Sequence, residues 1–174
     1  PRPQLRRDSY YCLNGEWDFK VIRKDKILLD SKILVPFPPE SKLSKINRIT
    51  KKGELLVYSR TFNLQELTSK TILNFGGVDN ICKVYINDNF VYENKGGYLP
   101  FSVDITNFVK VNKNTLRVEV LDSLDTNYPY GKQKYKRGGM WYTPVSGIWQ
   151  TVWLEYVPDT YITELKLTPD VDNE

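Results

Sequence analysis

The chain is divided into many short apolar runs in which apolar and polar residues alternate. Turn-forming residues separate the runs, and no long stretch repeats its apolar residues at the helical spacing. Side chains at period two lie on opposite faces of a β-strand, so the pattern predicts short strands with one buried face. The expected strands cover residues 16–21, 55–63, 71–75, 81–86, 89–93, 101–104, 115–121 and 147–156. This spacing favours an all-β chain, and we expect a jelly-roll β-sandwich of roughly eight to ten strands with almost no helix.

The boundary between two of these strands has a clear hairpin signal. Asn87-Asp88 lies between the expected strands 81–86 and 89–93, and both residue types tolerate the positive φ angles of a two-residue turn. Cys82 alternates with Val84 and Ile86 in the first of these strands, so we interpret it as a small buried hydrophobic residue.

Length and charge restrict the class of protein. A chain of 174 residues can bury a single core, and an aromatic content of 13% with ten Gly and ten Pro suits strands joined by turns. The net charge of +4 requires neither a nucleic-acid partner nor a membrane partner, and no apolar run reaches transmembrane length. We interpret the basic run 132–139 as a solvated loop near a binding site rather than as a nucleic-acid patch.

Histidine is absent, and this excludes Ser-His and Cys-His catalysis together with the commonest metal ligand. Cys12 and Cys82 give neither a disulfide framework nor a metal-ligand spacing, so we expect no metal and no cofactor. Free cysteines without a visible signal segment favour the cytoplasm. Because the sequence begins at Pro1 without Met, a removed signal, and with it a periplasmic or secreted location, stays open.

Three of the four tryptophans lie between residues 131 and 155, where a Gly-rich polar loop leads into the expected strand 147–156. Trp149 and Trp153 would share one face of that strand, opposite Ile148, Val152, Leu154 and Tyr156. Flat apolar rings beside fixed hydrogen-bonding groups are what a sugar needs, but tryptophans on strands also fill cores. Trp141 and Tyr142 belong to the loop, and loops carry function more often than strands do.

Five stretches, taken in order, carry a more specific signal. They read L-N-G-E-W-D-F at 13–19, V-P-F-P-P-E-S at 35–41, Y-S-R-T-F at 58–62, F-G-G-V-D at 75–79 with V-Y-I-N-D at 84–88 and G-G-Y-L-P-F at 96–101, and G-G-M-W-Y-T-P-V-S-G-I-W at 138–149. Together they resemble the N-terminal sugar-binding domain of glycoside hydrolase family 2, which includes β-galactosidases, β-glucuronidases and β-mannosidases. The resemblance implies a galactose-binding-domain-like jelly roll over residues 1–157. Residues 158–174 would then be a linker and the first strand of a truncated immunoglobulin-like domain.

The resemblance also implies a division of labour. Retaining glycosidases use two carboxyl groups about 5–5.5 Å apart, and in the family both are glutamates on a (β/α)₈ barrel that this chain lacks. We therefore expect no catalytic residue here, and a domain that contributes loops to the rim of the active site of a β-galactosidase-like parent enzyme. The expected partners are the immunoglobulin-like and barrel domains and a carbohydrate that binds weakly to the isolated chain. The alternatives are an autonomous carbohydrate-binding module or lectin, and a structural domain whose aromatic residues dock on neighbouring domains.

The candidate substrate-binding residues belong to two loops. Glu40 follows Pro38-Pro39, whose fixed φ angles would direct its carboxylate, although a loop anchor is the alternative role. The segment 122–144 is unusually long for a connection, and it supplies Asp125, Lys132, Gln133, Trp141 and Tyr142. A family aspartate reaches the sugar from a comparable part of the chain, which is why Asp125 is included. The family's early asparagine has no match beside Glu40, so the resemblance does not imply galactose specificity. Asp79-Asn80, after Gly76-Gly77, is interpreted as a loop anchor.

Overall fold

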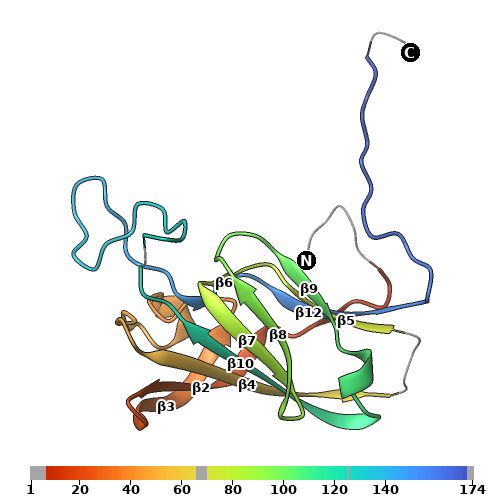
Figure 1. Cartoon of the computed structure of the whole chain (residues 1–174), viewed down its shortest axis with the longest axis horizontal. Helices are drawn as coiled ribbons and strands as arrows, with labels where there is room; N and C mark the ends of the chain where they lie inside the picture. The colour runs from red at the N-terminus through yellow and green to blue at the C-terminus, as the bar shows by residue number, and fades with distance from the viewer. Residues whose placement is uncertain (1–6, 66–69, 125, 172–174) are drawn as a thin grey trace.

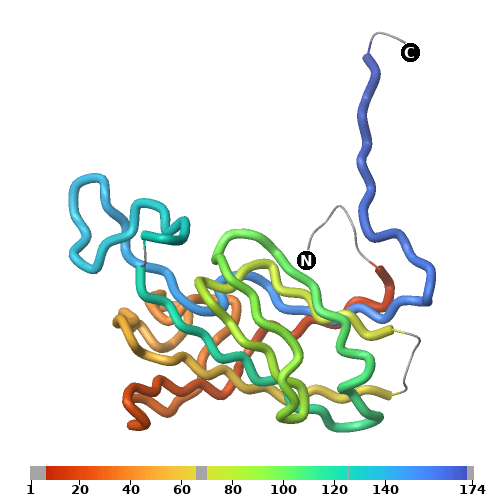
Figure 2. The backbone as a smooth tube through the Cα atoms, in the orientation of Figure 1, coloured from red at the N-terminus to blue at the C-terminus, as the bar shows by residue number. Residues whose placement is uncertain are grey.

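The computed structural model describes residues 7–65, 70–124 and 126–171, and its strands pair antiparallel throughout. Figures 1 and 2 show a β-sandwich with long loops at one end and an extended C-terminal segment at the other. The elements are β1 (Tyr11–Cys12), β2 (Gly15–Arg23), β3 (Lys26–Val35), η1 (Lys42–Ser44), β4 (Leu55–Leu64), β5 (Lys70–Phe75), β6 (Val78–Asp79), β7 (Ile81–Ile86), β8 (Asn89–Lys95), β9 (Phe101–Asp104), η2 (Thr106–Phe108), β10 (Asn112–Leu121), β11 (Gly147–Ile148) and β12 (Val152–Val157).

Two sheets enclose the core. One has the order β3-β2-β4-β10-β7-β8, the other has the order β1-β12-β5-β9, and a short β11-β6 pair lies at one end. Alternate residues point inward, as Leu116, Val118 and Val120 do on β10, where all three are fully buried. Apolar side chains from both sheets form one cluster, in which the Phe19 and Tyr58 rings lie 4.8 Å apart. The expected all-β jelly-roll sandwich is confirmed.

Local predictions in the middle of the chain are also confirmed. Asn87 and Asp88 have φ angles of 49° and 65°, so both occupy the left-handed region that a two-residue hairpin of this kind requires. Cys82 on β7 is fully buried, as its alternation with Val84 and Ile86 predicts.

The strand list was incomplete. The predicted set omitted β3, which pairs only with β2 at the edge of the six-stranded sheet and is exposed along most of its length. Because both faces of most of β3 meet solvent, its sequence carries little alternation. The other omissions, β1 and β6, have two residues each and are too short to show a period.

The prediction of one continuous strand over 147–156 was wrong. β11 pairs with β6 through Ile148 and Val78, whereas β12 pairs with β5 through Val152 and Phe75. Three residues (149–151) therefore lie opposite two (76–77), and the extra residue interrupts the strand as a β-bulge does. Glycine is needed opposite this bulge, because a Cβ on Gly77 would lie 2.9 Å from the Trp149 ring nitrogen.

The segment after β12 leaves the sandwich without pairing. Residues 158–171 contain no strand in the structure, and Figure 1 shows them extending away from the two sheets. Four of their apolar side chains are more than half exposed: Ile162, Leu165, Leu167 and Val171. Among the residues that the structure describes, no helix is long and apolar enough to cross a membrane.

Candidate functional site

Loops 36–54, 76–80, 96–100 and 122–146 meet at one end of the sandwich, and we call this surface the loop face. In Figure 1 the 122–146 loop projects from the left end of the molecule. Hydrogen bonds fix these loops: Ser146 bonds to Glu40 in another loop, Trp149 after β11 bonds to Gly97, and Gln133 bonds to Val145 within the 122–146 loop. Loop positions here are thus set by contacts between segments far apart in the sequence.

Glu40 is a central anchor of this surface. Its carboxylate accepts hydrogen bonds from the backbone N–H of Thr50 (3.1 Å), the backbone N–H of Ser146 (3.2 Å) and the Ser146 hydroxyl (2.7 Å). The Ser146 Oγ also lies 2.6 Å from Thr50 Oγ1. Burial raises the pKa of Glu40, and the hydrogen bonds from Ser146 and Thr50 oppose that rise. These contacts show that Glu40 anchors the loops, and its predicted contact with a sugar stays a prediction.

A second anchor lies beside the first. Arg48 donates two hydrogen bonds to the Glu54 carboxylate, at 2.7 and 2.6 Å, and the Lys51 backbone N–H donates a third at 2.9 Å. Glu54 is buried, so this two-pronged pairing satisfies a carboxylate that would otherwise be costly to bury. The pair closes the loop that carries residues 48–54.

Asp79 is the third anchor, and it lies beneath the glycine loop 96–97. Asp79 and Asn80 are both 6% exposed, and a Cβ on Gly97 would lie 2.3 Å from Asp79 Oδ1. Burial, together with the charge of Asp122, raises the pKa of Asp79 to about 7, and a hydrogen bond from Gln133 opposes the rise. The expectation that Asp79-Asn80 is a loop anchor agrees with this geometry.

Trp149 fixes the same glycine loop from the other side. Its ring N–H donates a 2.8 Å hydrogen bond to the Gly97 carbonyl, and its ring lies against Gly77. The Tyr98 ring meets the Trp149 ring nearly edge-on, with centroids 6.5 Å apart. Trp149 therefore contacts Gly77, Gly97 and Tyr98, and these contacts make it a packing residue of the loop face.

Gln133 connects the long loop to the sandwich. Its side-chain oxygen accepts a 2.6 Å hydrogen bond from the Val145 backbone N–H, and its amide hydrogen bonds to Asp79. Next to it, the Tyr142 N–H donates to the Lys132 carbonyl at 2.7 Å, and the Lys134 N–H donates to the Tyr142 carbonyl at 3.1 Å. These bonds hold the two sides of the loop together at its base.

The remaining predicted site residues of this loop differ in exposure. Tyr142 is 69% exposed, Lys132 is exposed, and Trp141 is half-buried with the Lys134 ammonium 3.7 Å from its ring centroid. Asp125 lies outside the described residues. Gln133 and Tyr142 are brought together by a backbone bridge, whereas Glu40 lines a hollow elsewhere on the loop face with Tyr135 and Arg137.

Sequence reasoning missed Thr50, Tyr135 and Ser146. Ser146 is fully buried and Thr50 almost fully buried. Both act by bonding to Glu40, which is 106 residues from Ser146 and 10 residues from Thr50 in the sequence. Only the position of Ser146, a polar residue just before an expected strand, could have drawn attention to it. Tyr135 was inside the basic run 132–139, which we interpreted as a solvated loop near a binding site without singling out its aromatic residue.

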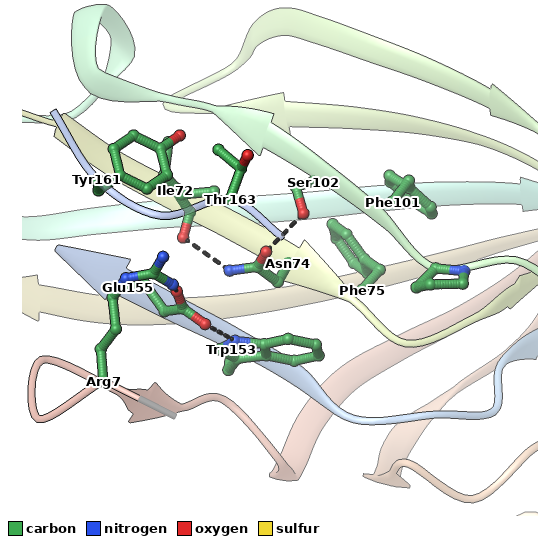
Figure 3. Close-up of a pocket in the computed structure, with 11 residues that line it drawn as sticks. Arg7, Ile72, Asn74, Phe75, Phe101, Ser102, Trp153, Glu155, Tyr161 and Thr163 are labelled. Atoms are coloured by element: carbon green, nitrogen blue, oxygen red, sulfur yellow. Dashed lines mark hydrogen bonds and ion pairs between the residues drawn. The ribbon is translucent and has the colours of Figure 1, made fainter. Parts of the chain in front are cut away.

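A separate hollow of about 290 Å³ lies on the outer face of the β1-β12-β5-β9 sheet. Figure 3 shows the Trp153 ring beside Glu155, with Arg7 next to the Glu155 carboxylate and Tyr161 further along the hollow near Ile72. The Trp153 N–H donates to Glu155 at 2.7 Å, Arg7 pairs with the same carboxylate, and Ser102 donates to Asn74 at 2.6 Å. Trp153 is only 8% exposed, so it packs there, and the Arg7–Glu155 pair attaches the chain before β1 to the outer sheet face.

The fold and the loop face define an antiparallel β-sandwich domain whose polar and aromatic loops gather at one end. The family model described as "Glycosyl hydrolases family 2, sugar binding domain" matches residues 36–158. The chain belongs to this family.

Individual relatives agree. A β-galactosidase from Thermoanaerobacter pseudethanolicus is 32% identical over 117 residues, which cover 65% of this chain and 15% of that protein. The human β-glucuronidase is 27% identical over 128 residues, covering 63% of this chain and 20% of that protein. The chain thus spans a small part of the length of the relatives that it matches.

Solved structures show the same fold. A β-glucuronidase from Ruminococcus gnavus, in complex with a C6-substituted uronic isofagomine, has a TM-score of 0.69 at 21% identity and covers 89% of this chain and 30% of that chain. A β-D-mannosidase from Dictyoglomus thermophilum has a TM-score of 0.65 at 23% identity, with coverage of 86% and 23%.

Proposed function

We propose that the chain is the non-catalytic sugar-binding part of a larger retaining glycosidase, β-galactosidase-like in class, and that its loop face forms part of the rim of the active site. The observation that carries this proposal is the anchoring of the 122–146 loop. Gln133 and Ser146 attach its base to buried carboxyl groups of the sandwich, while Tyr142 and Lys132 are presented to solvent. A rigid base that presents an aromatic ring and a cation to solvent suits a loop that contacts a sugar.

The carboxyl groups of this surface serve structure rather than catalysis. Glu40, Asp79 and Asp122 are each mostly buried, and Glu40 and Asp79 hold other loops in place. A nucleophile and an acid/base of a retaining enzyme must both reach the glycosidic bond. We therefore place the catalytic pair on another domain of the parent enzyme.

The extended segment after β12 supports a parent with further domains. Ile162, Leu165 and Leu167 are apolar, lie next to polar residues and are exposed. An exposed apolar strand-like segment without a partner is a site for pairing with another sheet. We propose that residues 158–174 are a linker and the first strand of an immunoglobulin-like domain.

The test uses the complete enzyme that contains this domain. Tyr142→Ala or Lys132→Ala should lower kcat/KM for nitrophenyl glycosides by about 2- to 10-fold, the equivalent of one hydrogen bond or ring contact of roughly 0.5–1.5 kcal/mol. Tyr11→Ala, on the exposed strand β1 outside the loop face, is the matched control and should leave kcat/KM unchanged. Equal effects of the Tyr11 and Tyr142 variants would contradict a role for the loop face.

An autonomous lectin makes a different prediction for the isolated chain. If the loop face supplies only part of a subsite, the dissociation constants of galactose, glucuronate and mannose should be millimolar or weaker. A small number of contacts does not offset the free-energy cost of association. Isothermal calorimetry measures this directly. Micromolar binding of any of the three would favour the lectin, and hydrolysis of nitrophenyl glycosides by the isolated chain would contradict the absence of catalysis.

A further inference from the structure

The loop face has two adjoining hollows that carry an excess of positive charge. One, of about 420 Å³, is lined by Lys42 and Arg137 among other residues, and the other, of about 470 Å³, by Arg23, Lys51 and Lys52. Ile49 and Tyr135 line both hollows and so form the wall between them. Five cations thus surround one small area of the surface.

None of these five cations forms a close ion pair with the carboxylates that the structure describes. Among the described residues, none of the five has a carboxylate oxygen within 4.0 Å of its side-chain nitrogens. The Lys42 hollow contains the Glu40 carboxylate, but its oxygens already accept hydrogen bonds from Thr50 and Ser146. The nearby Glu54 carboxylate is paired with Arg48, and the charge of Lys51 also helps to lower its pKa without forming a close ion pair.

The wall between the hollows is apolar and accessible. Tyr135 is 45% exposed and Ile49 is 41% exposed. A ring and a branched aliphatic side chain offer the C–H face of a sugar a flat apolar contact. An anionic group attached to such a sugar would lie near Arg23, Lys51 and Lys52 on one side, or near Lys42 and Arg137 on the other.

We propose that these hollows bind an acidic carbohydrate, whose uronate carboxylates or sulfate esters pair with the cations while a sugar ring lies on Tyr135 and Ile49. This inference rests on the proposed function and names the substrate class that the loop face would take. Nucleic acid fits the surface less well, because single strands bind to a charged groove with successive aromatic stacking positions. Here the cations surround a single exposed ring.

The experiment measures binding of the 174-residue chain to four ligands of similar length by calorimetry. They are an oligogalacturonide, a sulfated galactan oligosaccharide, a neutral galacto-oligosaccharide and a single-stranded DNA oligonucleotide. We expect at least one acidic saccharide to bind about 10-fold or more tightly than the neutral one, with affinity that falls as salt rises. Which acidic saccharide binds better distinguishes carboxylate from sulfate as the recognised group.

Two double variants with equal net charge locate the site. K42E/K52E reverses one cation in each hollow, and K110E/K113E reverses two exposed lysines next to the start of β10, about 30 Å along that strand from its loop-face end. K42E/K52E should weaken binding of the acidic saccharide about 10-fold or more, whereas K110E/K113E should change it less than 3-fold. K42Q/K52Q should give an intermediate loss, and near-ultraviolet circular dichroism confirms that each variant is folded.

Three results would overturn the inference. They are equal binding of neutral and acidic saccharides, equal losses in the two charge-reversed variants, and oligonucleotide binding as tight as that of the acidic saccharide. None of these bears on the proposed function, which depends on hydrolysis by the complete enzyme and its response to the Tyr142 variant. An active complete enzyme whose domain ignores acidic saccharides would contradict this inference alone.

Discussion

The carboxylate of Glu40 lies 2.7 Å from the hydroxyl oxygen of Ser146, although 106 residues separate them in the chain. This contact joins the loop after β3 to the segment just before β11. It also places the two residues next to Thr50, so that one partly buried carboxylate holds three segments of the loop face together.

Removing the Glu40 carboxylate should therefore destabilise the fold. Glu40→Ala leaves two backbone N–H groups and a hydroxyl without their acceptor, and we expect a loss of about 2–3 kcal/mol in the free energy of unfolding. Glu40→Gln keeps the shape and should cost less. Urea denaturation measures both, with the exposed Glu16→Ala as a control that should stay within about 1 kcal/mol of the parent. A Glu40→Ala protein as stable as the control would contradict the anchoring role.

Stability should fall as pH rises through neutrality because of Asp79. The folded protein raises the pKa of this carboxyl from its ordinary 3.8 to about 7, so the native state keeps a proton that the unfolded chain releases. The contribution is complete below about pH 4 and is lost as pH rises through about 7, by up to about 1.4 kcal/mol per pH unit. Thermal unfolding between pH 5 and 8 should show this slope.

The variant Asp79→Asn should reduce the slope, since the amide does not titrate. Glu40 and Asp122 have pKa values raised by burial, so a smaller slope of the same sign should persist. An unchanged slope in Asp79→Asn would assign the pH dependence to other groups.

Gly97→Ala should be destabilising for a steric reason. The new Cβ would lie 2.3 Å from Asp79 Oδ1 and 2.4 Å from its Cγ, so one of the two loops must shift. Overpacking of this kind costs about 1–3 kcal/mol. In an Asp79→Ala background the clash is smaller, and chemical denaturation of the four proteins of this double-mutant cycle should show the cost of Gly97→Ala decreasing. Additive costs would mean that the contact with Asp79 is not the cause.

Trp149→Phe should destabilise the protein more than Trp141→Phe. The Trp149 ring N–H bonds to Gly97, and its loss leaves a carbonyl acceptor without a partner, at about 1 kcal/mol or more. Trp141 is half-buried on the loop and contacts Lys134, so its replacement should cost about 0.5–1 kcal/mol at most. Thermal melts of the two variants compare them directly, and the reverse order of stability would contradict the packing role of Trp149.

The sequence predicted those parts of the fold in which the pattern is local. The turn at Asn87-Asp88 and the alternation of β10 depend only on neighbouring residues, and both are confirmed. β3 was missed because an edge strand with two exposed faces needs little alternation. The break at Trp149 was missed because it depends on Gly76 and Gly77, more than 70 residues earlier, on the opposing segment.

The candidate site could be predicted only as a set of loops. Its residue types indicated sugar chemistry, but their partners are distant in sequence: Glu40 with Ser146, Gln133 with Asp79, and Trp149 with Gly97. The sequence pattern does not indicate which distant residues form such pairs. The predicted sugar contacts stay predictions for all six residues: Glu40, Asp125, Lys132, Gln133, Trp141 and Tyr142. The positive charge of the hollows bears on a different question, which class of sugar binds.

The base of the 122–146 loop is held by Gln133 on one side and by Val145 and Ser146 on the other, so the ten or so residues between them bear little on the stability of the sandwich. Changes in this loop can therefore alter sugar specificity during evolution without altering the stability of the sandwich. Substitutions, insertions or a new terminus between residues 134 and 141 should be tolerated, and the same sandwich can then accept different sugars by exchanging only the tip of this loop.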